Sequence, residues 1–126
     1  MPRNPREGAI LIIDDDADVR GALRDTLEDE GYEVAEAAGG IAALAYLRSH
    51  PAPAIIFLDW NMAPMNAPQF MDELSKEPGL SQLPVVLITA DMHANQKVKT
   101  GGYRDFLTKP LDLDQLFSVI GRLASG

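Results

Sequence analysis

Three short runs of consecutive apolar residues constrain the fold of this chain more than any other feature. They occupy residues 9–13 (AILII), 54–58 (AIIFL) and 84–88 (PVVLI). A strand with one wet face alternates polar and apolar residues, so an unbroken run indicates a strand buried on both faces. Two less apolar segments, 32–36 (YEVAE) and 103–108 (YRDFLT), are predicted as further strands, with 32–36 nearer an edge of the sheet.

A segment with apolar residues at helical spacing follows each of these strands. The clear stripes are Val19, Leu23 and Leu27; Ile41, Leu44, Ala45 and Leu47; Phe70, Met71 and Leu74; and Leu113, Leu116, Phe117, Ile120 and Leu123. The stretch 91–100 has the weakest pattern, because Met92 and Val98 are its only strong apolar residues. It predicts a short fourth helix.

Strand and helix therefore alternate five times, which predicts an α/β fold with five strands and five helices. Unbroken apolar strands between amphipathic helices indicate a parallel sheet covered on both faces. Right-handed crossovers then give a doubly wound open sheet, in which ligands bind at the carboxyl ends of the strands. Residues 9–124 are predicted to form this one domain, preceded by a disordered lead-in at residues 1–8.

Composition narrows the possible partners. The 126 residues contain no cysteine, which excludes disulfides and thiolate metal sites and suits a cytoplasmic location. The net charge of −8 repels phosphate backbones and anionic membranes, so direct binding to nucleic acid is not expected. The longest apolar runs have the length of strands rather than of membrane spans, and no membrane association is expected.

Polar residues gather where four of the five predicted strands end. Asp14 and Asp15 follow the first strand, and Asp59 follows the third. Thr89 ends the fourth strand and Lys109 the fifth. Singly, each has an ordinary explanation as a helix cap, a turn residue or a loop residue. Because the carboxyl ends of parallel strands meet at one edge of the sheet, their joint occurrence indicates a site.

The residue types at these ends indicate phosphoryl transfer. Three clustered carboxylates repel one another and need a cation, and oxygen ligands without His or Cys favour Mg²⁺. A cation and an ammonium group can neutralise charge on a moving phosphoryl group, while a carboxylate serves as the nucleophile. Thr89 could then donate a hydrogen bond to a phosphoryl oxygen.

With this set of residues, the sequence resembles response-regulator receiver domains from about residue 9 to 124. The run Asp59-Trp60-Asn61-Met62 looks particularly like the chemotaxis member of that family. The resemblance implies a flavodoxin-like sheet of strand order 2-1-3-4-5. It also implies a phosphoacceptor switch in a two-component phosphorelay. The switch would take a phosphoryl group from a sensor histidine kinase or a histidine phosphotransfer protein.

The same resemblance implies a role for each site residue. Asp59 would be the phosphoacceptor and a ligand of Mg²⁺, Asp15 would bind Mg²⁺ directly, and Asp14 would act through water or as a further ligand. The main-chain carbonyl of Asn61 would complete the protein ligands. Thr89 and Lys109 would contact the phosphoryl group, and Thr89 with the aromatic Phe106 would form the switch.

The resemblance further implies a cis Lys109–Pro110 bond. An unknown output partner would bind the face made by the helix in 91–100, the strand 103–108 and the last helix. The protein would not be an enzyme beyond its own phosphorylation and dephosphorylation at Asp59.

Some positions depart from the family pattern. The loop after the acceptor reads Met62-Ala63-Pro64-Met65-Asn66-Ala67, so the usual proline has moved by one place and Ala67 replaces a glycine. Tyr103 stands where a small residue is common, and Phe106 lacks the hydroxyl of the commoner tyrosine. The segment between Thr89 and Lys109 is about two residues shorter than is usual. These changes predict an altered loop 62–67 and a short or shifted fourth helix.

Three alternative functions remain at this point. The first is an interaction module that keeps the fold without regulation by phosphate. The second is a phosphohydrolase of the haloacid dehalogenase type, since Asp14 and Asp16 form a DxD motif; multiple turnover on a phosphomonoester would distinguish it. A flavodoxin-like electron carrier is the poorest alternative, because the acidic first loop would repel a flavin phosphate.

Overall fold

The computed structural model describes residues 8–91, 98 and 100–125. Its five parallel strands lie in the order β2-β1-β3-β4-β5, which confirms the predicted doubly wound, flavodoxin-like α/β fold. The strands are β1 (Ile10–Ile13), β2 (Val34–Ala37), β3 (Ile55–Asp59), β4 (Val85–Thr89) and β5 (Asp105–Thr108). The helices are α1 (Ala17–Asp29), α2 (Gly40–Ser49), α3 (Ala67–Ser75) and α5 (Leu113–Ser125).

The prediction of five helices is wrong for the described part of the chain, which has four. The additional helix was expected in 91–100, and residues 92–97 and 99 lie outside the described residues. Val98, Thr100 and Gly101 do have helical backbone. The prediction had its weakest basis in this segment, because its few apolar residues do not form a continuous stripe. The predicted lead-in at residues 1–8 also falls almost entirely outside the described part.

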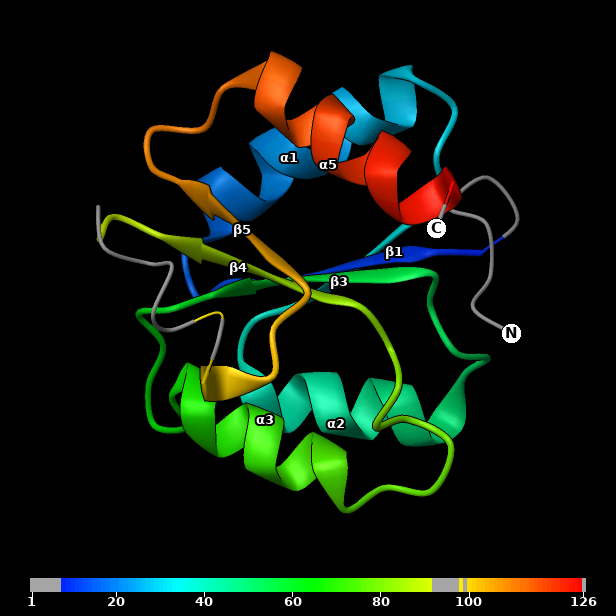
Figure 1. Ribbon diagram of the computed structural model, residues 1–126, viewed down its shortest axis with the longest axis vertical. Helices are drawn as coiled ribbons and strands as arrows, with labels where there is room; N and C mark the ends of the chain where they lie inside the picture. The colour runs from blue at the N-terminus through cyan, green and yellow to red at the C-terminus, as the bar shows by residue number, and fades with distance from the viewer. Residues whose placement is uncertain (1–7, 92–97, 99, 126) are drawn as a thin grey trace.

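The sheet is covered on both faces, as the unbroken apolar runs predicted. Figure 1 shows α1 and α5 on one face of the sheet and α2 and α3 on the other. Successive residues of each strand point to opposite faces, so Leu11 and Ile13 pack with the α2 and α3 layer while Ile10 and Ile12 pack with the α1 and α5 layer. Every residue of β1 is completely buried.

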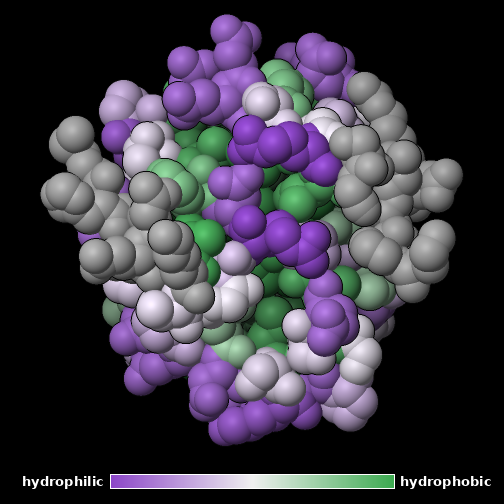
Figure 2. Space-filling view, in the orientation of Figure 1, coloured by the Kyte–Doolittle hydropathy of each residue, from purple (hydrophilic) through white to green (hydrophobic). Residues whose placement is uncertain are grey.

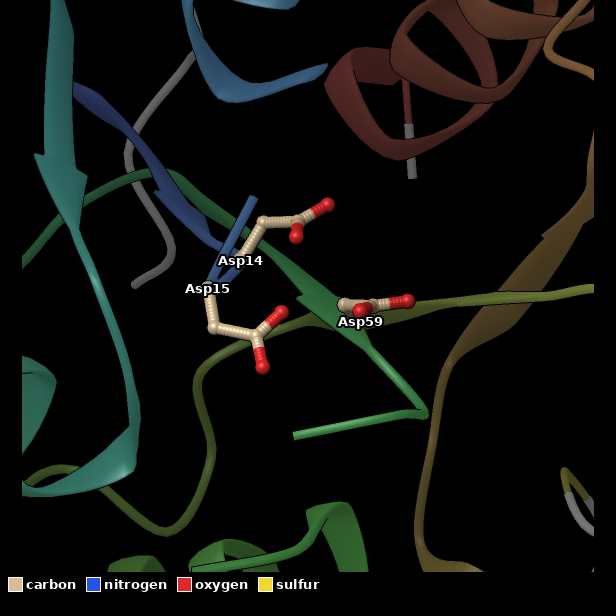
Figure 3. Close-up of side chains that lie close together, drawn as sticks. All are labelled: Asp14, Asp15 and Asp59. Carbon is tan, nitrogen blue, oxygen red and sulfur yellow. The ribbon is translucent and has the colours of Figure 1, made fainter. Parts of the chain in front are cut away.

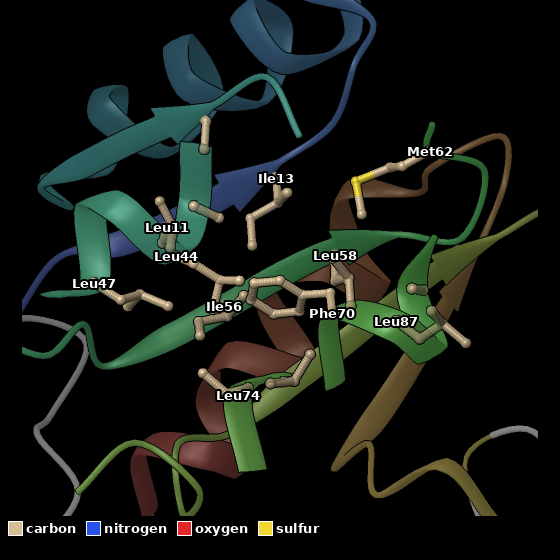
Figure 4. Packing of buried hydrophobic residues seen from close by; sticks show 14 of the residues in the cluster. Leu11, Ile13, Leu44, Leu47, Ile56, Leu58, Met62, Phe70, Leu74 and Leu87 are labelled. Carbon is tan, nitrogen blue, oxygen red and sulfur yellow. The ribbon is translucent and has the colours of Figure 1, made fainter. Parts of the chain in front are cut away.

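The hydrophobic residues form two clusters, one on each side of the sheet. In Figure 4 the ring of Phe70 from α3 lies against Ile56 and Leu58 of β3, at the centre of the first cluster. Figure 2 shows the result at the surface: the outer sides of the helical layers are hydrophilic, and hydrophobic residues show mainly between them. No helix in residues 8–91 and 100–125 combines the length and the hydropathy needed to cross a bilayer.

Capping hydrogen bonds at the helix ends determine where the loops at the carboxyl edge of the sheet give way to helix. The carboxylate of Asp16 accepts hydrogen bonds from the main-chain N–H groups of Asp18 and Val19, so the acidic loop runs directly into α1. Gly31 follows the end of that helix with a φ of 89°, a conformation that glycine adopts without cost. Asp112 caps α5 in the same way.

The loop between β3 and α3 accommodates its unusual sequence without backbone strain. Asn66 and Gln69 form a capping box, in which each side chain accepts a hydrogen bond from the other residue's main-chain N–H. Ala67 is the first residue of α3 and is buried, and no described residue other than glycine has a positive φ. The alanine therefore replaces the usual glycine at no conformational cost. The Ala63–Pro64 bond in this loop is cis.

Candidate functional site

Three carboxylates meet at the carboxyl edge of the sheet, as their positions in the sequence predicted. Asp14 follows β1 and Asp59 is the last residue of β3, and these two strands are neighbours in the sheet. Asp14 is 1% exposed and Asp59 3%, whereas Asp15 lies at the surface. One carboxylate oxygen from each residue lies within 4.8 Å of the other two. Figure 3 shows the three side chains gathered at the ends of the two strands.

Lys109 directly follows β5, which is separated from β3 and Asp59 by β4. Its Nζ lies 3.0 Å from Asp59 Oδ1, and its main-chain N–H donates to the carbonyl of Thr89 at 2.9 Å. Burial by itself would lower the pKa of Lys109, but the neighbouring Asp59, Asp14 and Asp16 carboxylates outweigh it and hold that pKa above its ordinary value. The ammonium group is therefore charged at neutral pH. The Lys109–Pro110 bond is cis, as the resemblance implied.

The pKa of Asp14 is raised above the ordinary value of its carboxyl group. Burial raises its pKa, and repulsion from Asp59 and Asp15 adds to this effect. A hydrogen bond from the main-chain N–H of Asp16 to Asp14 Oδ1 at 2.9 Å acts in the opposite direction, as does the charge of Lys109. The net result is a raised pKa, so this group gains from any further positive charge.

Two buried oxygens of the site lack a hydrogen-bond donor within the described residues. They are Asp14 Oδ2 and Asp59 Oδ1, the second of which has only the ion pair with Lys109. A buried oxygen without a donor costs about 1–3 kcal/mol, so Asp14 Oδ2 has reason to bind a cation, and Asp59 Oδ1 offers a second buried oxygen beside the Lys109 ammonium group. With Asp15 they offer only hard oxygen ligands, which fits Mg²⁺. Asn61 lies two residues beyond Asp59, at the exposed start of the loop to α3.

Thr89 and Phe106 lie on the same face of neighbouring strands. Phe106 pairs directly opposite Leu87, and alternation along β4 places Thr89 on the same face as Leu87. Thr89 is 2% exposed and its Oγ1 accepts a hydrogen bond from the main-chain N–H of Asp91 at 3.1 Å. Phe106 is partly buried against the α2 and α3 cluster. Thr89 therefore lies two residues along β4 from the residue that pairs with Phe106, on the same face of the sheet.

The predicted output face can be described only in part. Most of its 91–100 segment, residues 92–97 and 99, lies outside the described residues. At the other end of this face, Arg122 of α5 donates to Asp105 of β5 at 2.6 Å, which ties the last helix to the edge strand.

Two residues of the site were missed by the sequence reasoning. The sequence indicated Asp16 only as part of a DxD motif. Its main-chain N–H in fact holds the Asp14 carboxylate, and its own carboxylate caps α1. Arg20 of α1 was not singled out, yet its guanidinium donates to the main-chain carbonyl of Asp14 at 2.6 Å. Nothing in the sequence indicates which oxygen an arginine on this helix would contact.

The comparisons with known proteins agree on one family. Residues 10–121 match the family described as the response regulator receiver domain. The chain is 33% identical over 119 residues to protein PilH of Pseudomonas aeruginosa, and the match covers 93% of this chain and 98% of PilH. Other curated relatives are longer, and the chain spans about half of their length, 51% and 47% in two of them.

Solved structures show the same fold. The chemotaxis protein CheY4 of Vibrio cholerae superposes with a TM-score of 0.83 at 28% identity, covering 92% of this chain and 98% of that protein. The response regulator TrrA of Thermotoga maritima, in complex with Mg²⁺ and BeF, has a TM-score of 0.80 at 25% identity, with coverage of 92% and 98%.

Proposed function

This chain belongs to the response regulator receiver domain family of two-component signalling, and from that membership we propose that Asp59 accepts a phosphoryl group from a phospho-histidine donor. The observation that carries the proposal is the position of the Asp59 carboxylate, which is buried among Asp14, Asp15 and Lys109 at the carboxyl edge of the sheet. We take residues 9–124 as the domain that performs this function.

The proposed step is a phosphoryl transfer between two side chains. An oxygen of Asp59 attacks phosphorus, the new O–P bond forms, and the N–P bond of the donor histidine breaks with its electron pair returning to the imidazole. Lys109, now paired with Asp59, would follow the negative charge onto a phosphoryl oxygen. The Thr89 hydroxyl would donate a hydrogen bond to another of these oxygens.

We propose that the site uses Mg²⁺, held by Asp14, Asp15 and Asp59 together with the main-chain carbonyl of Asn61. The support is the oxygen-only ligand set and the two buried oxygens without donors. The complex of the related TrrA with Mg²⁺ and BeF points to the same cofactor. When bound, the cation would supply positive charge to the phosphoryl oxygens during transfer.

We propose that the donor protein docks on an apolar groove beside Lys109. The groove has a volume of about 330 Å³ and lies between α1 and the loop that leads to α5. It is lined by Val19, Ala22, Leu23, Thr26, Lys109, Pro110, Leu111 and Leu113. Leu113 is 54% exposed, a large apolar side chain that a partner helix could cover. A histidine kinase or histidine phosphotransfer protein seated here would bring its phospho-histidine next to the site.

The phosphoryl group would then shift a conformational equilibrium. Movement of Thr89 toward the phosphoryl group leaves space beside β4, and Phe106 on the same face could fill it. Phe106 has no hydroxyl, so the change would act through packing alone. The output partner would read this change at β5 and α5. The shift is limited by the free energy of the new phosphoryl contacts.

Among the alternatives, the aspartyl phosphohydrolase gains no support. In a DxD site the second aspartate must be available for chemistry, but the Asp16 carboxylate is committed to capping α1. The phosphate-independent module was favoured by the unusual 62–67 loop and by the short helix expected in 91–100. The Asn66 cap accommodates the loop without backbone strain, and most of 91–100 lies outside the described residues. We therefore propose a phosphoacceptor without other enzymatic activity, and a cytoplasmic location suited to a chain without cysteine.

Intact mass measurement tests this proposal directly. The protein and its Asp59→Asn variant are incubated with a small acyl phosphate, with and without Mg²⁺. A single phosphoryl adduct that needs Mg²⁺ and is absent from the variant is the expected result. Equal labelling of the variant would contradict the assignment of Asp59, and no adduct under any condition would favour the phosphate-independent module.

A further inference from the structure

We propose that Arg20 is a positioning residue for the cation site, because it fixes the peptide group that joins Asp14 to Asp15. The inference rests on the proposed function of this site as a Mg²⁺ site. Arg20 itself does not touch the carboxylates through any described contact. It acts on the main chain that carries them.

The contact is short and specific. A terminal nitrogen of the Arg20 guanidinium donates to the main-chain carbonyl oxygen of Asp14 at 2.6 Å. This carbonyl belongs to the peptide that connects the two acidic residues. The orientation of that peptide sets the direction in which the Asp15 side chain leaves the chain. Hydrogen bonds from a charged donor are roughly twice as strong as neutral ones.

The Arg20 side chain is itself held in place by Glu36. Its Nε donates to Glu36 Oε1 at 3.1 Å, and Arg24, one helical turn further along α1, donates to Glu36 Oε2 at 2.8 Å. Glu36 lies on β2, directly opposite Ile12 of β1. The Arg20 side chain is only 17% exposed. The guanidinium therefore bridges the sheet and the acidic loop, and its planar fork fits both partners at once.

Asp14 is held by two further hydrogen bonds, whereas the position of Asp15 depends on the peptide that Arg20 contacts. The main-chain N–H of Asp14 donates to the carbonyl of Ala37 at 3.2 Å, and Asp14 Oδ1 accepts from the N–H of Asp16 at 2.9 Å. Asp15 lies at the surface, and its carboxylate makes no hydrogen bond or ion pair with another described residue. Among the described contacts, the Arg20 hydrogen bond is therefore the one that holds the peptide group between Asp14 and Asp15.

A positioning role for Arg20 and a simple effect of its charge predict opposite changes in Mg²⁺ affinity when Arg20 is replaced. Replacing Arg20 by glutamine removes a positive charge near an anionic site, and by Coulomb's law alone this change would tighten the binding of a divalent cation. If Arg20 orients the ligands, the same change weakens binding. Residues behind metal ligands typically alter affinity by about 10–100-fold when replaced, so we expect weakening of about tenfold.

The test is a Mg²⁺ titration of the wild-type protein and three variants, followed by Trp60 fluorescence and by calorimetry. Arg20→Gln removes both the charge and the contact, whereas Arg20→Lys keeps the charge but lacks the fork. Arg24→Gln is the matched control, because Arg24 lies on the same helix and binds the same Glu36 without touching Asp14. Thermal unfolding without Mg²⁺ shows whether each variant keeps its fold.

Support would be a dissociation constant for Mg²⁺ about tenfold higher in Arg20→Gln, with most of that loss also in Arg20→Lys, and little change in Arg24→Gln. Unchanged or tighter binding in Arg20→Gln would overturn the inference, as would full recovery in Arg20→Lys or equal weakening in Arg24→Gln. Absence of Mg²⁺ binding by the wild-type protein would overturn the proposed function as well. The two failures are therefore distinguishable.

Discussion

Lys109 Nζ lies 3.0 Å from Asp59 Oδ1, although the two residues come from strands separated by β4. The pair neutralises only one of the charges at a site with two buried carboxylates and a third beside them. This leaves the site anionic overall, and the proposed phosphoacceptor Asp59 is already paired with the ammonium group that would neutralise a phosphoryl oxygen. In the proposed Mg²⁺ site, the ammonium group and the metal ion would share the Asp59 carboxylate.

The first prediction follows from this sharing. Lys109→Ala should tighten Mg²⁺ binding by about tenfold, because the metal no longer competes with an ammonium group for the Asp59 carboxylate. The same variant should label more slowly with an acyl phosphate, since the charge on the phosphoryl oxygens is less well stabilised. Trp60 fluorescence and intact mass measure the two effects. Lys76→Ala, which removes an exposed lysine paired with Asp72, is the control. Mg²⁺ binding that weakens in Lys109→Ala would contradict the shared-carboxylate argument.

The second prediction concerns the burial of the Asp14 carboxylate. Without metal, Asp14→Asn should raise the free energy of unfolding at pH 7 by about 1–2 kcal/mol, because it removes a buried charge while keeping an acceptor for the Asp16 N–H. The folded protein raises the pKa of Asp14, so the wild type loses stability as pH rises through that pKa. The advantage of the variant should therefore disappear below the ordinary carboxyl pKa of 3.8. Urea unfolding at several pH values measures it.

Asp29→Asn, at the exposed end of α1, serves as the control for Asp14→Asn and should change stability little at any pH. A variant Asp14→Asn that is less stable than the wild type at neutral pH without metal would show that its charge is already compensated. Mg²⁺ should restore the wild type more than the variant, since the variant has lost a ligand.

The third prediction concerns Tyr103, which replaces a small residue of the family pattern. Its ring is buried, its hydroxyl has no hydrogen-bond partner within the described residues, and burial raises its pKa to about 12. Tyr103→Phe should therefore be neutral or stabilising by up to about 1 kcal/mol, whereas Tyr103→Ala should cost about 3–5 kcal/mol. Urea unfolding measures both. A loss of more than about 1 kcal/mol in Tyr103→Phe would reveal a partner for the hydroxyl.

The fourth prediction tests the docking groove. Leu113→Glu should slow transfer from a phospho-histidine protein at least about tenfold, because it places a charge in the apolar contact. Labelling by a small acyl phosphate should stay unchanged, since no protein has to dock. Ile41→Glu is the matched control: Ile41 is 61% exposed and Leu113 54%, but Ile41 lies in the first turn of α2, on the other face of the sheet. Equal effects of the two substitutions on protein-to-protein transfer would place the donor elsewhere.

The sequence could predict much of the fold because burial on both faces leaves a clear pattern. The runs at 9–13, 54–58 and 84–88 became β1, β3 and β4 within about one residue at each end. The weak pattern of 91–100 was the exception: only Asp91, Val98 and Thr100 of this segment are described, and the described part of the chain has four helices instead of the predicted five. A strand or helix with a continuous apolar face is determined by its own residues, whereas a segment without one depends on its neighbours.

The sequence alone was also enough to predict that Asp14, Asp15, Asp59 and Lys109 lie together. Each stands at the end of a strand, and parallel topology brings such ends to one edge. The contacts among these residues and behind them could be seen only in the folded chain. The bond from Arg20 to the Asp14 carbonyl and its restraint by Glu36 depend on how α1 lies over β1 and β2. Such contacts join residues far apart in the chain through particular side-chain rotamers, and no local pattern encodes them.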